Sequence, residues 1–378
     1  MKKTAFISAM NPGNMGMYTV DRAIIELFGE KNHNVSIFCA HPPFKMGYYK
    51  FKKVGINIGL KKEWSEGKVT KKSYGNPQQL NEFERIVFWG DFTLNPEYCV
   101  NDFADYDVRF GISADRGEAI KRWRNIFSTR NFSGPEIITF GQNFLHETLS
   151  YGNEFFGDVK YMLSGTSLAL PRDSKSTENI KSLGVENCTV IQACDPAMLK
   201  ILKHEPRREK DFFVYYFSRS ILKNADELIS SVSKKLNLEA RELKNWNRAN
   251  EDYEDRWKNL SDLIKESRFL ITDTYHCAVN AISLHKIPLV ISNPSASQSG
   301  TLGDFKKKVL LEDCRLSDYH FESDEANCIS TGTIEATIGA ARELLHGDSA
   351  ERNTLLKTAN KVANNSRQIL FEFLDFAE

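Results

Sequence analysis

Short apolar runs alternate with amphipathic segments along the chain, and this pattern predicts an α/β protein. Such runs are typical of strands that are buried on both faces, as in a largely parallel sheet. In the first half, strands are predicted at Thr4–Ala9, Val35–Ala40, Arg85–Trp89, Asp107–Ile112, Glu136–Phe140, Val159–Met162 and Thr189–Ala193. A helix is predicted at Thr19–Gly29, because apolar residues recur there at helical spacing and a glycine ends the pattern.

The same alternation resumes beyond residue 211, which predicts a second α/β unit. Its strands are predicted at Phe212–Phe217, Phe269–Thr272 and Pro288–Ser292, and its helices at Ala225–Leu236, Leu260–Ser267, Cys277–Leu284, Thr331–Leu345 and Glu351–Phe373. The polar, proline-containing run His204–Asp211 separates the two units and is the predicted interdomain linker.

The length of the chain supports two domains. Its 378 residues exceed the size at which a single hydrophobic core stops growing. We predict two Rossmann-like domains, residues 1–204 and 205–350, whose largely parallel sheets face a central cleft. Residues 351–378 are expected to form a helix that packs back on the first domain, and the aperiodic segment Lys45–Asn81 is interpreted as an irregular insertion near the cleft.

Charge and cysteine content argue against several classes of protein. Lys and Arg together number 50, as do Asp and Glu, so no global field would hold nucleic acid or an anionic membrane. The seven cysteines contain no C-x-x-C pair, which argues against a zinc site or disulfide framework and favours a reducing, cytoplasmic compartment. No apolar run is long enough to span a membrane, and the apolar stretch near the N-terminus is interpreted as a strand rather than a secretory signal.

The segment Gly13-Asn14-Met15-Gly16 lies between the first predicted strand and the first predicted helix. Its glycines would let the backbone approach a ligand, and the helix N-terminus offers unpaired N–H groups. The segment is not G-x-G-x-x-G, so a dinucleotide fingerprint is absent. The alternative interpretation is a plain strand-to-helix turn.

Two arginines follow predicted strands, where open α/β sheets bind ligands. Arg172, in Arg172-Asp173-Ser174-Lys175-Ser176, comes after the predicted strand Val159–Met162 and the loop that follows it. Its guanidinium could bind a carboxylate or phosphate with two hydrogen bonds, or it could be a solvated arginine beside a helix cap. Arg219, in Ser218-Arg219-Ser220, is also expected to point toward the cleft.

The polar group Asp273-Thr274-Tyr275-His276 interrupts an otherwise apolar segment. A histidine at a helix N-terminus can bind an anion or act as a general acid. A capping role for Thr274 with a structural His276 is the alternative. The clustering of polar residues in so apolar a segment favours a functional site, and we expect Arg172 and His276 to meet across a shared anionic ligand.

In their order and spacing, these segments resemble the polysaccharide pyruvyl transferase family, from about Thr4 to Ser317. The resemblance also rests on Gly141-Gln142, Gly184-Val185, Asp195-Pro196-Ala197 and Ile287-Pro288. Two positions depart from the family pattern. Thr274 stands where many members carry an arginine that helps to bind phosphoenolpyruvate, and Trp89-Gly90-Asp91 stands where members often have a glycine triplet.

The resemblance implies a GT-B-like fold and an enzyme that moves a pyruvyl group from phosphoenolpyruvate onto a sugar of a glycan or glycan precursor, as a ketal. It implies an acceptor side in the first domain, a donor side in the second, and no metal or cofactor besides the co-substrate. His276 would act as acid or phosphate ligand, with Asp91 or Asp273 as base. The implied donor-binding residues are Gly13, Asn14, Gly16, Arg172, Arg219, Thr274, Tyr275 and His276.

Two other functions stay open at this point. One is a GT-B glycosyltransferase that uses a nucleotide-sugar donor, because a fold does not fix the chemistry. The other is a noncatalytic glycan-binding relative that has lost its donor site, which Thr274 would explain. Peripheral contact with a membrane that carries a lipid-linked substrate is compatible with any of the three.

Overall fold

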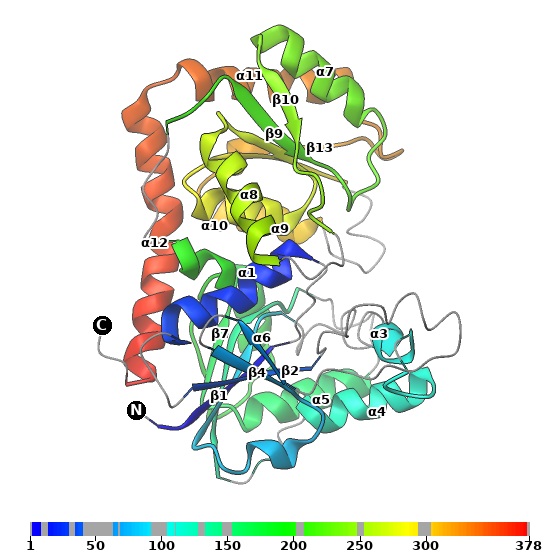
Figure 1. The fold of residues 1–378 in the computed structure, drawn as a ribbon, viewed down its shortest axis with the longest axis vertical. Helices are drawn as coiled ribbons and strands as arrows, with labels where there is room; N and C mark the ends of the chain where they lie inside the picture. Colours follow the sequence, from blue (N-terminus) through cyan, green and yellow to red (C-terminus); the bar gives the residue numbers. More distant parts are fainter. Residues whose placement is uncertain are drawn as a thin grey trace.

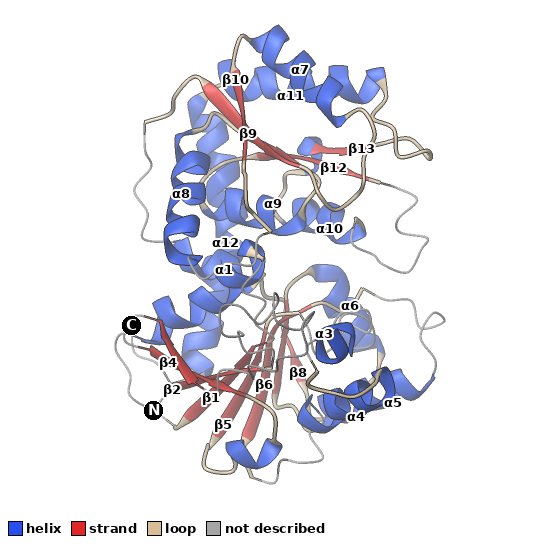
Figure 2. Cartoon of the chain, turned by 45° about the vertical axis from the view of Figure 1, so that its right-hand side comes forward, coloured by secondary structure: helices blue, strands red, loops and turns tan. Residues whose placement is uncertain are grey.

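Two β-sheets, each flanked by helices, make up the protein (Figure 1). The computed structural model describes residues 2–8, 14–29, 35–40, 63–66, 69–91, 104–109, 111–127, 132, 134–145, 153–201, 208–247, 253–293 and 304–375. Among the helices that lie between the two sheets (Figure 2) are α1 (Met15–Ile24), α6 (Ser174–Ser182), α9 (Tyr275–Ser283) and α10 (Phe305–Asp313).

The first sheet has eight strands in the order β3-β4-β2-β1-β5-β6-β7-β8, and only the β3–β4 pair is antiparallel among the described strands. The strands are β1 (Thr4–Ser8), β2 (Val35–Cys39), β3 (Glu63–Glu66), β4 (Val69–Ser73), β5 (Arg85–Trp89), β6 (Glu136–Gln142), β7 (Leu168–Pro171) and β8 (Thr189–Val190). β1 pairs with β2 on one side and with β5 on the other, so the strand order reverses at β1. Ligands of open α/β sheets bind in the crevice beside such a reversal, at the carboxyl ends of the strands.

Alternate residues of these strands pack on helices from opposite sides of the sheet, as the pleat requires. Phe6 and Trp89 belong to the core that includes α1, whereas Ile7 and Phe88 belong to the core that includes Val159 and Ile180. The further helical segments of this domain are η1 (Ile25–Gly29), η2 (Pro77–Leu80), α3 (Ala104–Arg109), α4 (Arg116–Phe127), α5 (Asn153–Ser164) and η5 (Pro196–Ile201).

The second sheet has five parallel strands in the order β10-β9-β11-β12-β13. They are β9 (Phe212–Tyr216), β10 (Glu239–Glu242), β11 (Leu270–Thr272), β12 (Pro288–Ser292) and β13 (His320–Glu322). Here the order reverses at β9, which lies between β10 and β11. The further helices are α7 (Ala225–Leu236), α8 (Tyr253–Glu266), η7 (Ser317–Tyr319), α11 (Thr331–His346) and α12 (Ser349–Phe373).

Helix α12 runs from the second sheet along the side of the molecule to the first sheet (Figure 1). The ring of Phe371, near its end, contacts the ring of Phe28 with centroids 5.7 Å apart. Beyond the helix, a carboxylate oxygen of Asp375 lies 3.6 Å from Nη2 of Arg85 in β5. The last helix therefore connects both α/β units.

Direct contacts also join the two units around α1. The side-chain amide of Asn280 in α9 donates to the hydroxyl of Thr19 in α1 at 3.0 Å. The backbone N–H of Met15 donates to the carbonyl of Trp246 at 3.1 Å, and that of Ser174 donates to Oδ2 of Asp313 at 2.8 Å. The N-termini of α1 and α6 are thereby both fixed to the second domain.

Two predicted strands are wrong. Val159–Met162 lies inside α5, because Val159, Met162 and Leu163 form one buried face at helical spacing. Asp107–Ile112 begins in helix α3, where the buried Asp107 carboxylate accepts a hydrogen bond from Nη1 of Arg122 at 2.8 Å. In both cases a short apolar run was compatible with either kind of element, and tertiary contacts decide for the helix.

Two other predictions are corrected in extent. The predicted strand Thr189–Ala193 is confirmed only over Thr189–Val190. Residues 45–62 and 67–68 of the predicted insertion lie outside the described residues, and the remainder contains β3, β4 and η2. Because β4 pairs in parallel with β2, that part of the segment extends the first sheet.

Candidate functional site

The predicted site residues come from loops that follow the strands of both sheets. On the first sheet these loops follow β5, β7 and β8, and on the second sheet they follow β9 and β11. The predicted residues concerned are Asp91, Arg172, Arg219, Asp273 and Thr274, with Tyr275 and His276 at the start of α9. Asp195, which follows β8, was not predicted as a site residue and entered only through a motif of the family resemblance. The strand that precedes Arg172 is β7 (Leu168–Pro171) and not the predicted Val159–Met162, and the arginine follows β7 directly.

Arg172 is 4% exposed and lies among carboxylates. Its Nη1 donates to Oδ2 of Asp91 at 2.6 Å, and its Nε lies 3.8 Å from Oδ2 of Asp173. Burial opposes the charge, but Tyr275 and the neighbouring carboxylates raise the pKa of Arg172 above its ordinary value, so the guanidinium stays charged. Its Nε and Nη2 are buried without a hydrogen-bond partner among the described residues, which leaves two N–H directions for a ligand.

Asp195 joins residues from the two domains. Its Oδ2 lies 3.5 Å from Nη1 of Arg172 and 3.5 Å from Nε2 of His276. Its Oδ1 accepts a hydrogen bond from the backbone N–H of Ala197 at 3.0 Å. Burial opposes ionisation, but His276 and Arg172 hold the pKa of Asp195 below its usual value. Arg172 and His276 therefore approach the same oxygen of a charged carboxylate.

The ring of Tyr275 covers the guanidinium of Arg172. The centre of the guanidinium lies 4.4 Å from the ring centroid, and Nζ of Lys306 lies 5.0 Å from the same ring. Tyr275 also meets the ring of His276 edge-on, with centroids 5.3 Å apart. Cations over an aromatic face are attracted by its quadrupole, so Tyr275 holds Arg172 and Lys306 close to each other despite their like charge.

Lys306 is a site residue that the sequence analysis missed. It is 9% exposed at the start of α10, and burial together with repulsion from Arg172 lowers its pKa to about 8. The run Lys306-Lys307-Lys308 has the appearance of a solvated helix face, yet only Lys308 is exposed. Lys307 is buried and donates to Oγ of Ser220 at 2.9 Å. No local sequence signal separates the three lysines, because their burial depends on packing against the second sheet.

Gly16 gives the first helix its close approach to His276. A Cβ atom on Gly16 would lie 2.3 Å from Cβ of His276 and 2.5 Å from its Nδ1. Asn14 caps the same helix, since its side-chain oxygen accepts from the backbone N–H of Gly16 at 2.8 Å. Gly13 lies outside the described residues. The structure thus brings Asn14 and Gly16 to the site through backbone packing and capping contacts.

Asp273 binds the loop that follows β9. Its carboxylate accepts hydrogen bonds from the backbone N–H groups of Ser218, Arg219 and Ser220 at 2.9, 2.9 and 2.7 Å. The hydroxyl of Thr274 donates to Oδ1 of the same carboxylate at 2.9 Å. Arg219 is exposed on this loop, and its charge contributes to the lowered pKa of Lys306. Asp273 therefore positions the loop, and its role as a base stays a prediction.

Gly141 and Asp195-Pro196-Ala197 belong to one packing contact. Gly141 has φ of 76°, and a Cβ atom there would lie 2.5 Å from Cδ and Cγ of Pro196. Only glycine meets both requirements, so the turn that carries Asp195 rests directly on the end of β6. This contact holds the end of β6 against the Asp195-Pro196-Ala197 turn, although the two segments are distant in the sequence.

The first turn of α9, which contains Tyr275 and His276, is also part of the candidate site. Its N-cap Thr274 makes no side-chain capping hydrogen bond, so the N-terminal N–H groups of α9 keep their tendency to bind an anion.

Within the described part of the chain, no group of three or more His, Cys, Asp or Glu residues has the arrangement of a metal site. Among the described helices, none has the length and apolar character needed to cross a membrane.

A family model described as polysaccharide pyruvyl transferase matches residues 22–295, which is more than half of the chain. The chain belongs to the polysaccharide pyruvyl transferase family. The matched range includes Arg172, Asp195 and His276, whereas Gly16 and Lys306 lie outside it. Family membership indicates a glycan-modifying enzyme of the transferase type. No curated protein matches the chain significantly.

Solved structures support the predicted GT-B fold. UDP-GlcNAc 2-epimerase from Neisseria meningitidis, bound to UDP-GlcNAc, is similar to this chain with a TM-score of 0.51 at 10% identity, over 98% of each chain. A putative UDP-N-acetylglucosamine 2-epimerase from Listeria monocytogenes has a TM-score of 0.49 at 10% identity, over 100% of this chain and 98% of its own. At 10% identity the likeness to the Neisseria enzyme shows the fold alone, and the GT-B-like architecture of this family member is confirmed.

Proposed function

We propose that this protein transfers the pyruvyl group of phosphoenolpyruvate to two hydroxyls of a sugar in a glycan or glycan precursor. The observation that carries the proposal is the approach of Arg172 and His276, from different domains, to the same oxygen of Asp195. Membership of the pyruvyl transferase family supports the reaction class. The donor would bind where these side chains meet the N-terminus of α9.

The donor carries a carboxylate and a phosphate, and this group of residues offers cationic contacts for both. Lys306 lies beside Tyr275, Arg219 lies on the neighbouring loop, and the first turn of α9 presents N–H groups. The unpaired Nε and Nη2 of Arg172 add two further donors. A buried unpaired donor costs about 1–3 kcal/mol, and an anionic ligand that accepts from it removes that cost. These cations would replace the arginine that many family members carry where this chain has Thr274.

The chemistry requires one acid and one base. A first sugar hydroxyl adds to C2 of the enolpyruvyl group while C3 takes a proton, and a tetrahedral phosphate ester results. Phosphate then leaves, and a second hydroxyl closes the ketal at the same carbon. Of the two hydroxyl protons, one balances the proton that C3 received and the other leaves with phosphate. We assign His276, beside Asp195, as the acid and Asp91 as the base.

Binding measurements separate this proposal from the alternatives. Phosphoenolpyruvate is expected to raise the melting temperature of the wild-type protein, because a ligand that binds only the folded state stabilises it. A UDP-, GDP- or CMP-sugar is expected to have no comparable effect. Stabilisation by a nucleotide sugar alone would assign the site to a glycosyltransferase, and stabilisation by neither would favour a noncatalytic glycan-binding protein.

A matched pair of variants locates the bound donor. Lys306→Met removes the buried cation beside Tyr275, and Lys308→Met removes an exposed cation two positions further along the same helix. Phosphoenolpyruvate is expected to bind at least about tenfold more weakly to the first variant and unchanged to the second, which corresponds to about 1.4 kcal/mol. Equal affinity for both variants would remove Lys306 from the donor site.

A further inference from the structure

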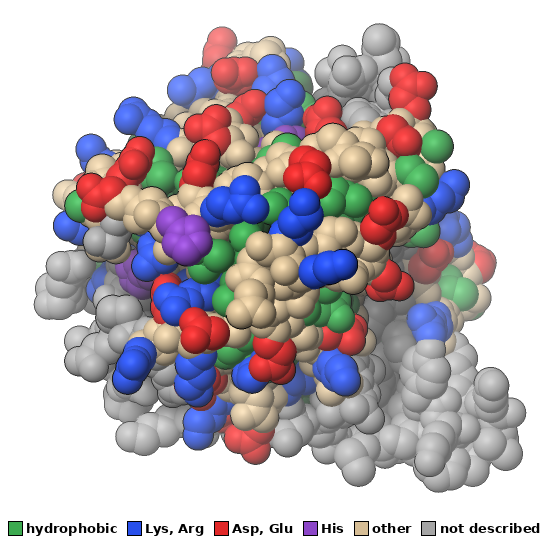
Figure 3. Space-filling model, turned by 90° about the horizontal axis from the view of Figure 1, so that it is seen from above, with side chains coloured by type: hydrophobic (Ala, Val, Ile, Leu, Met, Phe, Trp, Pro, Cys, Tyr) green, Lys and Arg blue, Asp and Glu red, His purple; other side chains and the backbone are tan. Residues whose placement is uncertain are grey.

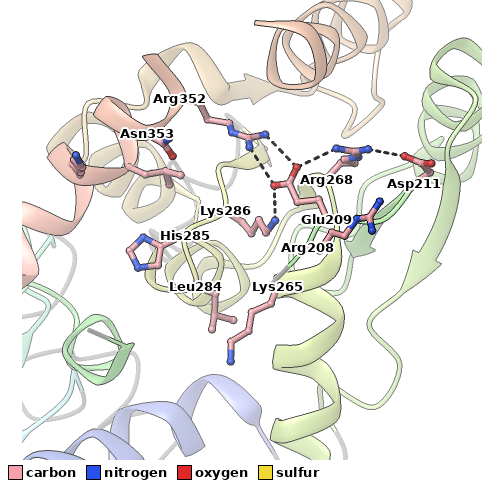
Figure 4. A pocket seen from close by; sticks show the side chains of 12 residues that line it. Arg208, Glu209, Asp211, Lys265, Arg268, Leu284, His285, Lys286, Arg352 and Asn353 are labelled. Atoms are coloured by element: carbon pink, nitrogen blue, oxygen red, sulfur yellow. Dashed lines mark hydrogen bonds and ion pairs between the residues drawn. The ribbon is translucent and has the colours of Figure 1, made fainter. Parts of the chain in front are cut away.

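A cavity of about 740 Å³ lies in the second domain, apart from the donor site (Figure 4). Four chain segments line it: residues 208–211 before β9, residues 265–268 at the end of α8, residues 284–286 after α9, and the first turns of α12. Its volume falls in the range of about 300–1,000 Å³ that is usual for small-molecule sites. His276 lies at the other end of α9, a nine-residue helix about 13 Å long. The cavity and the donor site are therefore distinct.

The lining of this cavity is strongly basic. Glu209 and Asp211 are the acidic residues that line it. Against these two carboxylates stand six lysines and arginines, namely Arg208, Lys265, Arg268, Lys286, Arg352 and Lys357. Four positive charges are left over, in a chain whose formal net charge is zero. On the end of the second domain that Figure 3 shows, by contrast, acidic and basic side chains are interspersed. The excess is a local feature of the cavity.

Glu209 fixes part of this basic group in place. Its carboxylate oxygens lie 2.7 Å from Nζ of Lys286, 3.3 Å from Nη1 of Arg268 and 3.4 Å from Nη2 of Arg352 (Figure 4). Burial opposes the charge of this carboxylate, but Lys286 and the two arginines hold the pKa of Glu209 below its usual value. Asp211 binds Arg268 at 2.7 Å. Three cations are thus held by ion pairs, which pre-organises the wall of the cavity.

Two of the remaining lining cations, Arg208 and Lys357, are not neutralised in this way. Arg208 and Lys357 have no ion-pair partner among the described residues, and both side chains line the cavity. Lys265 is buried at the end of α8 and lines it as well. Like charges gathered in one concave surface repel each other and focus a positive potential, which a bound anion relieves.

We propose that this cavity binds a small soluble anion with two or more adjacent phosphate groups, held by Arg208 and Lys357. The excess of four positive charges matches a diphosphate better than a single phosphate, and the volume is larger than one phosphate needs. Arginine binds phosphate oxygens in pairs, and lysine supplies point charges. The site binds independently of the donor, so the proposal does not rest on pyruvyl transfer.

Calorimetric titration with inorganic pyrophosphate tests the proposal. Wild-type protein is expected to bind pyrophosphate at least about tenfold more tightly than orthophosphate. The double variant R208Q/K357Q is expected to lose at least tenfold in pyrophosphate affinity. The control R116Q/K234Q, with the same change of charge at exposed positions, should bind as the wild type does.

A variant of the donor site tests whether pyrophosphate binds there and not in the basic cavity. Lys306→Met is expected to keep the full affinity for pyrophosphate, and a loss there would place the anion in the donor site and overturn the proposal. Wild-type affinity in R208Q/K357Q, or no binding to the wild type, would also overturn it. If vesicles that contain phosphatidic acid bind the wild type while soluble pyrophosphate does not, the ligand is a lipid headgroup and the proposed soluble anion is wrong.

Discussion

Replacing Gly16 by alanine tests how closely the two domains meet at the site. The added methyl group would lie 2.3 Å from Cβ and 2.4 Å from Cγ of His276, so the backbones of α1 and α9 must separate. Ordinary carbon contacts begin near 3.5 Å, which requires a shift of roughly 1 Å. Overpacking of this kind costs about 1–3 kcal/mol. The Gly16→Ala variant is therefore expected to be less stable than the wild type by that amount.

Urea denaturation followed by circular dichroism measures this loss, and a double-mutant cycle assigns its cause. His276→Ala keeps the closest atom, Cβ, and should not relieve the contact, whereas His276→Gly removes it. The destabilisation by Gly16→Ala is expected to shrink in the His276→Gly background and to persist in the His276→Ala background.

A second glycine serves as the control for helix propensity. Gly339 lies inside α11, and a Cβ atom there would meet nothing within 4 Å. Gly339→Ala is expected to stabilise the protein by up to about 1 kcal/mol, because alanine is the better helix former. If Gly16→Ala also stabilised the protein, or if its effect did not depend on position 276, the close packing of α1 on α9 would be refuted.

Three further predictions follow from buried charges. Phosphoenolpyruvate affinity should fall as the pH rises through about 8, where Lys306 loses its proton, and Lys306→Met should abolish this dependence in titrations across that range. Asp273→Asn should destabilise the protein by about 3 kcal/mol in denaturant titrations, since three backbone N–H groups lose a charged acceptor; Asp324→Asn, in an exposed turn, should cost under about 1 kcal/mol. Arg122→Gln should cost about 3–5 kcal/mol because it leaves the buried Asp107 carboxylate unpaired, and an effect below about 1 kcal/mol would contradict that ion pair.

Sequence patterns predicted the sheets well where strands are buried on both faces. The strands Arg85–Trp89 and Pro288–Ser292 were predicted with the bounds that the structure has. Such short, nearly continuous apolar runs are typical of strands that are buried on both faces of a parallel sheet. Val159–Met162 was wrong because four residues do not distinguish a strand from part of a helical face. The length of α5 became evident only with its packing on the sheet.

The candidate site was predictable to the extent that it follows strand ends. His276 lies at the start of the helix that follows a predicted strand. Arg172 follows β7, a strand that the sequence analysis did not predict, so its place at a strand end was expected from the wrong strand. The part played by Asp195 depends on the docking of α9 against the first domain, which joins residues about eighty positions apart. Lys306 is buried where the start of α10 meets the ring of Tyr275. Contacts of this kind are set by tertiary structure and leave no local periodicity.

The central claim is that Arg172, Asp195 and His276 form a donor site for phosphoenolpyruvate. Calorimetric titration of the wild type with phosphoenolpyruvate, beside His276→Gln and the control His346→Gln at an exposed position of α11, tests it most directly. The account predicts saturable binding at one site per chain, weakened at least about tenfold by His276→Gln and unchanged by His346→Gln. Equal affinity in all three proteins, or no binding to any of them, would contradict it.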